Sequence, residues 1–242
     1  TIPSFSLNQY GLYGDLANAP AHAVTHHPAT LSWVEAAAVW MQYLTAYGAL
    51  IDIGKLAKGD TALIPAASSS VGLAAIQIAN RVGAVPVALT RGRSKRQALL
   101  DAGAAHVIAS DEQDLVKEVL QITSGKGARI VFDPVGGPQG TAAMGALARD
   151  GKHLAIGFAS GTWPTVDVQM MTLTNTSLVG VLAAGYSQEH IEGILQELTA
   201  MVTSGAVRET VIEKVPFGEV PDALTRVAAR KTLGKCVVDV RG

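Results

Sequence analysis

Residues 61–77 read Thr-Ala-Leu-Ile-Pro-Ala-Ala-Ser-Ser-Ser-Val-Gly-Leu-Ala-Ala-Ile-Gln, in which a short apolar run passes through small residues into a helical pattern. The pattern predicts a strand over 61–66 and a helix over 71–81. Small side chains let backbone amides approach an anion, and the helix N-terminus adds partial positive charge. Taken alone, the turn fits a dinucleotide site and a Ser-rich helix cap equally well, because Gly72 is the one glycine in it.

The same alternation of strand and helix continues along the chain. Further strands are predicted over 86–90, 106–109, 129–133 and 152–157, and further helices over 94–102, 112–122 and 139–147. Parallel strands need crossover connections, and those connections carry helices. The alternation therefore predicts a doubly wound α/β fold with a parallel (Rossmann) sheet, and residues 177–182 are a candidate sixth strand.

The segments on either side of this alternation have different sequence patterns. Residues 1–30 hold several Gly and Pro residues and short β-like pieces such as 21–24, which suggests the end of a β-rich unit. Ser32 and Glu35 form a capping box that predicts a helix ending near Thr45, with another turn over 47–50. Beyond Gly185 the pattern predicts helices over 190–202 and 220–229 and a strand over 236–240.

Composition excludes several classes of protein. The 242 residues are 48% hydrophobic and 16% charged, which predicts a folded chain of at most two lobes. Nineteen basic and 20 acidic residues give a net charge of −1, so we expect no affinity for nucleic acid or an anionic membrane. Cys236 is the single cysteine, which excludes an internal disulfide and a thiolate-rich zinc site and fits the cytoplasm.

The sequence was also read for membrane-spanning helices and for a signal peptide. No apolar run reaches the roughly 18 to 20 residues that a spanning helix needs. Residues 1–5 read Thr-Ile-Pro-Ser-Phe, without Met or a signal-peptide pattern. We therefore expect a soluble fragment of a longer protein.

A basic segment follows the second predicted strand. In a dinucleotide fold this is where a carboxylate binds the ribose of NAD, but here Thr90, Arg91, Arg93 and Lys95 precede the first carboxylate, Asp101. Arginine and lysine make charge-assisted hydrogen bonds to phosphate. The segment therefore predicts a 2′-phosphate site and NADPH as the cofactor; the alternative is a solvated basic loop.

Two more turns complete the pattern, Asp-Pro-Val-Gly-Gly at 133–137 and Gly-Phe-Ala-Ser-Gly at 157–161. With Lys-Gly-Asp-Thr at 58–61, Gly-Ala-Ala-His-Val-Ile at 103–108 and Gly-Lys at 234–235, the whole chain resembles the medium-chain dehydrogenase/reductase superfamily. It looks most like the zinc-independent quinone oxidoreductase and enoyl reductase branch, without most of the N-terminal GroES-like domain. The resemblance implies three parts: the end of the GroES-like catalytic domain over 1–43, the Rossmann domain over 44–185, and a return to the catalytic domain over 186–242.

The resemblance also implies roles for single residues. Thr45 matches a threonine beside the nicotinamide ribose and phosphate, Lys95 a lysine on the 2′-phosphate, and Phe158 and Leu182 positions that line the nicotinamide end. From residues and resemblance together we predict cofactor contacts from Thr45, Ser68, Ser69, Ser70, Val71, Gly72, Thr90, Arg91, Arg93, Lys95, Val135, Gly136, Phe158 and Leu182.

No metal is expected. In zinc-dependent relatives a Cys ligand stands four residues before the threonine, and here that residue is Met41, whose thioether is a poor zinc ligand. His26 and His27 are adjacent in a loop, where histidines are more often solvated than metal-bound.

The predicted function is hydride transfer from NADPH to a quinone or an α,β-unsaturated carbonyl compound without zinc. No acid or base is assigned; Tyr43 and Tyr47 are weak catalytic candidates that are more often core aromatics. The alternatives are a zinc-type alcohol dehydrogenase relative and a non-catalytic NADPH-binding module. Relatives commonly pair the edge strands of two sheets, so a homodimer is expected.

Overall fold

The structure, a computed structural model, describes residues 14, 16–182, 185–208 and 212–241. The chain divides into two compact units. One unit is Thr45–Ala183, and the other combines Thr1–Leu44 with Ala184–Gly242.

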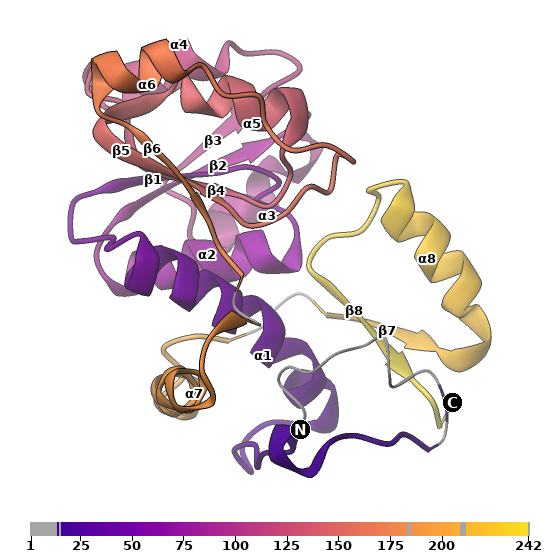
Figure 1. The fold of residues 1–242 in the computed structure, drawn as a ribbon. Coiled ribbons are helices and arrows are strands. Elements are labelled where there is room, and N and C mark those ends of the chain that lie inside the picture. Colours follow the sequence, from indigo (N-terminus) through magenta and orange to yellow (C-terminus); the bar gives the residue numbers. More distant parts are fainter. Residues whose placement is uncertain (1–13, 15, 183–184, 209–211, 242) are drawn as a thin grey trace. The chain divides into compact units, whose positions relative to one another are not determined.

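The unit over Thr45–Ala183 is built on a six-stranded parallel sheet (Figure 1). Its strands are β1 (Thr61–Ile64), β2 (Val85–Thr90), β3 (His106–Ala109), β4 (Ala128–Asp133), β5 (Leu147–Ala155) and β6 (Ser177–Gly180). The order β3-β2-β1-β4-β5-β6 confirms the predicted doubly wound fold. All carboxyl ends meet at one edge, and the direction of strand addition changes between β1 and β4.

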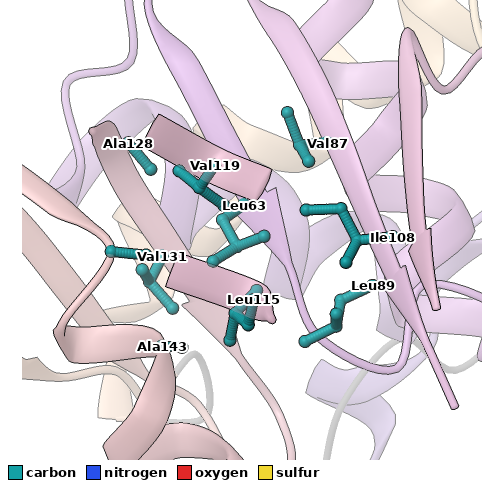
Figure 2. Packing of buried hydrophobic residues seen from close by; sticks show 10 residues of the cluster. Leu63, Val87, Leu89, Ile108, Leu115, Val119, Ala128, Val131 and Ala143 are labelled. Atoms are coloured by element: carbon teal, nitrogen blue, oxygen red, sulfur yellow. The ribbon is translucent and has the colours of Figure 1, made fainter. Parts of the chain in front are cut away.

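Helices cover both faces of this sheet. They are α2 (Ser70–Arg81), α3 (Arg96–Asp101), α4 (Leu115–Ile122), α5 (Gly137–Met144) and α6 (Val168–Thr174). Figure 1 shows α2 and α3 on one side of the sheet and α4 and α5 on the other. In Figure 2, Leu115 and Val119 of α4 pack with Leu63 of β1 and Val131 of β4 in the buried apolar cluster. This cluster holds the crossover helices against the strands.

Several predicted bounds in this unit are wrong. β1 ends at Ile64 rather than at 66, because Ala66 has a left-handed φ of 47°. The helix predicted over 112–122 begins at Leu115, since the Asp114 side chain caps it. Residues 145–147 are not helical: α5 ends at Met144 and β5 begins at Leu147, before the 152 expected.

The other unit contains part of α1 (Trp33–Tyr47), α7 (Gln188–Thr203), α8 (Val220–Ala228), and the parallel pair β7 (Ile212–Pro216) and β8 (Lys235–Asp239). The predicted capping box is confirmed: Ser32 N–H donates to Glu35 Oε2 at 2.9 Å, and Glu35 N–H donates to Ser32 Oγ at 3.3 Å. The β-like piece expected over 21–24 is wrong, because Ala21–Ala23 forms a 3₁₀ turn. Strand β7 was not predicted.

Candidate functional site

The loops that follow β1, β2, β4 and β5 lie at the carboxyl edge of the sheet, because these four strands are parallel neighbours. In open α/β sheets this edge is where ligands bind. Most of the predicted cofactor contacts lie at this edge. They are Ser68 and Ser69 in the loop after β1, Ser70 to Gly72 in the first turn of α2, Thr90 at the end of β2, Arg91, Arg93 and Lys95 after it, and Val135, Gly136 and Phe158 in the loops after β4 and β5. Thr45 lies on α1, and Leu182 lies beyond the end of β6.

The turn after β1 is tight and specific to glycine. Ser69 is the N-cap of α2, and its Oγ accepts the Gly72 N–H at 3.2 Å. A Cβ on Gly72 would stand 2.6 Å from Ala67 Cα and 2.7 Å from Ala67 O. Helix α2 can pack this closely on the preceding turn only because Gly72 has no side chain. The turn is thus a serine-capped helix start with a close contact between the helix and the turn backbone.

A lysine joins the turn after β1 to the basic segment after β2. Lys95 Nζ donates to Ser68 Oγ at 3.3 Å. Burial, and then repulsion from Arg91, hold the pKa of Lys95 below its usual value. A partly buried lysine close to an exposed arginine favours the arrival of an anion.

Arg93 has a carboxylate partner that the sequence did not indicate. Its Nε lies 2.5 Å from Oε2 of Glu112, in the loop after β3. Both side chains are well exposed, at 70% and 42%. Within the basic segment, Arg93 is therefore engaged by a neighbouring loop, whereas Lys95 reaches toward the turn after β1.

The loops after β4 and β5 are joined by backbone hydrogen bonds. Ser160 N–H donates to Val135 O at 3.0 Å, and Gly137 N–H donates to Thr162 O at 2.9 Å. Gly136 has a left-handed φ of 66°, and a Cβ there would collide with Thr162 O. This role of Thr162 could not be predicted from the sequence, because it depends on two loops that meet only in the folded chain.

A buried pair lies below these loops. The side chains of Asp133 and His153 are fully buried, with Nε2 of His153 2.9 Å from Oδ2 of Asp133. His153 is a polar residue within a predicted apolar strand, and this could have indicated a buried polar pair. The pair was not predicted from the sequence.

Aromatic side chains mark the surface beside these loops. The rings of Phe158 and Trp163 are 4.8 Å apart, and the residues are 52% and 53% exposed. Tyr43, one of the two weak catalytic candidates, is only 1% exposed and belongs to the core, whereas Tyr47 is half-buried.

Among the described residues, no three His, Cys, Asp or Glu side chains are grouped as metal ligands. Met41 is 47% exposed, and the ring of His27 packs edge-on against Trp33 at 5.1 Å. Of the helices in the described ranges, none is long and apolar enough to cross a bilayer.

Comparisons with known proteins agree with this arrangement. A family model described as zinc-binding dehydrogenase matches residues 70–200. The human synaptic vesicle membrane protein VAT-1 homolog is 30% identical over 96% of this chain, which spans 63% of that protein's length. The Escherichia coli quinone oxidoreductase structure complexed with NADPH has a TM-score of 0.84 and 29% identity, covering 90% of this chain and 68% of that one. A mycobacterial protein complexed with NADPH has a TM-score of 0.87 and 28% identity, covering 93% and 70%.

Proposed function

Since this chain belongs to the zinc-binding dehydrogenase family of the medium-chain dehydrogenase/reductase superfamily, in its quinone oxidoreductase and VAT-1 branch, we propose that it binds NADPH. We also propose that it delivers hydride to a quinone or an α,β-unsaturated carbonyl compound without zinc. Residues 44–185 form the cofactor lobe, and 1–43 and 186–242 belong to the catalytic lobe. The protein works in the cytoplasm.

The observation that carries the proposal is the arrangement of cations at the carboxyl edge. Arg91 and Lys95 follow β2, where an NAD-binding chain needs a carboxylate. Lys95 is already directed to Ser68 in the first turn, so a 2′-phosphate would bind between two loops. The two solved relatives described above were crystallised with NADPH, which supports the same cofactor here.

The chain's own residues bind and orient the cofactor. The pyrophosphate lies at the N-terminus of α2, whose close packing on the preceding turn Gly72 permits, and the joined loops after β4 and β5 border the nicotinamide half. Bound NADPH supplies the hydride. The exposed Phe158 and Trp163 offer apolar surface beside this half, which suits a planar acceptor.

The described residues do not fit a zinc ion. Met41 stands where the resemblance places a cysteine ligand, and no group of three ligand side chains is present in the described ranges. The proposed hydride transfer therefore uses no zinc ion. A non-catalytic NADPH-binding module is the second candidate, favoured by the burial in the core of Tyr43, one of the two weak catalytic candidates.

We further propose a homodimer formed through β6. This strand lies at the end of the sheet order and hydrogen-bonds to β5 along one side. An edge strand presents N–H and C=O groups that a second copy can pair with.

The cofactor proposal is tested by titrating the chain with NADPH and NADH in a calorimeter. The R91A/K95A double variant should lose affinity for NADPH by roughly 30-fold or more, because two charge-assisted contacts are removed, and should keep its affinity for NADH. The matched control is R81A/K126A, which removes the same charges from exposed positions before β2 and β4. Equal affinity of the unsubstituted chain for both cofactors would contradict the 2′-phosphate site.

Turnover separates the two candidate functions. The full-length protein, with NADPH and a panel of quinones and enones, should oxidise NADPH if the reductase proposal is correct. Tight NADPH binding without turnover on any acceptor would favour the non-catalytic module.

A further inference from the structure

The fully buried pair His153–Asp133 sits at the base of the loop after β4. Asp133 is the last residue of β4, and its Oδ1 accepts the N–H groups of Val135 and Gly136, each at 2.9 Å. Its other oxygen, Oδ2, lies 2.9 Å from Nε2 of His153 on the neighbouring strand β5. One carboxylate therefore shapes the loop with one oxygen and is held by the histidine with the other.

The environment of the imidazole selects its tautomer. Nδ1 of His153 is buried and has no hydrogen-bond partner among the described residues. A proton on Nδ1 would be a buried donor without an acceptor, which is unfavourable. The geometry therefore favours a ring whose Nε2 carries a proton and donates it to Asp133 Oδ2.

The held loop is coupled to the loop after β5. Ile156 N–H donates to Asp133 O at 2.9 Å, and Ala159 N–H donates to Pro134 O at 3.2 Å. Gly140 also lies against Oδ2, where a Cβ would collide with the carboxylate. The Asp133 carboxylate thus holds the loop after β4, and backbone hydrogen bonds join that loop to the loop after β5.

These two loops lie on the opposite side of the β1–β4 switch point from the basic segment after β2. A dinucleotide crosses the sheet edge at this point. If the 2′-phosphate binds at Arg91 and Lys95, as proposed above, the nicotinamide half lies against the loops after β4 and β5.

We propose that His153 is a positioning residue that, through Asp133, holds the loops bordering the nicotinamide half of NADPH. This inference rests on the proposed function. It predicts that His153 affects binding of the whole dinucleotide and leaves binding of its adenosine half unchanged.

The test compares two ligands on two variants. Adenosine 2′,5′-bisphosphate carries only the adenosine half, whereas NADPH carries both halves. H153L removes the donor to Asp133 and should weaken NADPH about 10-fold, with adenosine 2′,5′-bisphosphate changed less than about twofold. H153Q, whose amide N–H can replace the imidazole donor, should recover NADPH affinity to within about threefold of the unsubstituted chain.

A destabilising control separates positioning from general damage. V119A opens a cavity in the buried cluster of Figure 2, away from these loops, and should lower the melting temperature without changing either affinity. If H153L does not fold, H153M takes its place.

Three results would overturn the inference: parallel loss of both ligands in H153L, unchanged NADPH affinity in H153L, or no recovery in H153Q. A failure of the proposed function looks different, because the unsubstituted chain would then bind neither ligand.

Discussion

Gly72 carries the strictest requirement of any single residue in the turn after β1. A side chain there would meet the backbone of Ala67 at 2.6 Å, and backbone cannot move aside as a flexible side chain can. The other small residues of the turn are alanine and serine, and the structure has room for the Cβ of each. The requirement at Gly72 is thus one of packing, and it holds whether or not a nucleotide is bound.

We predict that G72A destabilises the chain by about 3 kcal/mol, because overpacking displaces the turn from α2. It should also weaken NADPH binding. G92A is the matched control: Gly92 has extended backbone, φ −117°, and open space around a Cβ, so its cost should stay within about 0.5 kcal/mol. Denaturant unfolding measures both, and equal stability of the two variants would contradict the argument.

Glu112 forms an ion pair with Arg93 of the basic segment. We predict that E112Q releases Arg93 and raises NADPH affinity roughly threefold at low salt, since an exposed pair of this kind contributes little energy. NADH affinity should not change, because NADH lacks the 2′-phosphate. Calorimetry at low and high salt checks this; an equal gain for NADH would mean that Glu112 acts elsewhere.

At the scale of elements, helix α1 depends on its first turn. The Ser32–Glu35 capping box satisfies donors that the helix leaves open, and Arg208 lies 3.3 Å from Glu35 in the same unit. The hydrogen bonds from Ser32, and secondarily Arg208, hold the pKa of Glu35 below its usual value of 4.5. The box was readable from the sequence because its two residues are three apart.

We predict that S32A and E35A each lower the stability of this unit by about 1 kcal/mol at neutral pH. The carboxylate of Glu35 binds its partners only when ionised, so its contribution is complete above pH 4.5 and is lost as the pH falls through the lower folded pKa. The difference between the unsubstituted chain and E35A, followed by circular dichroism during denaturation, should therefore shrink in acid. A stability difference between the two proteins that grew as the pH fell would contradict this prediction.

Helix α6 and strand β7 were not predicted, because neither has the apolar pattern that is typical of a helix or a strand. Helix α6 has no buried residue, and Val168 and Leu173 on it are 70% and 62% exposed, so no buried apolar face marked it. Strand β7 contains Glu213 and Lys214 and ends in Pro216, a composition that argues against a strand. It forms because β8 lies beside it in parallel register.

At the scale of the whole molecule, the open edge of β6 determines the proposed assembly. Val181 N–H donates to Ala155 O at 2.9 Å, and in a parallel strand alternate N–H groups face opposite sides. The N–H of Leu178 therefore faces the open edge.

We predict that L178P gives a monomer, because proline removes an edge donor without breaking the ladder to β5. L178V keeps the donor and should remain dimeric. Light scattering over a range of concentrations distinguishes them. A dimer that survives in L178P would place the interface elsewhere.

The family, the parallel sheet, the glycine of the first turn and the cationic segment were all legible in the sequence. Each depends on residues close together in the chain, where periodicity, capping and backbone preference act locally. The strand order, the Arg93–Glu112 pair and the His153–Asp133 pair were decided by tertiary structure alone. The two residues of each pair belong to different strands or loops. They come together only when the strands have assembled in their final order.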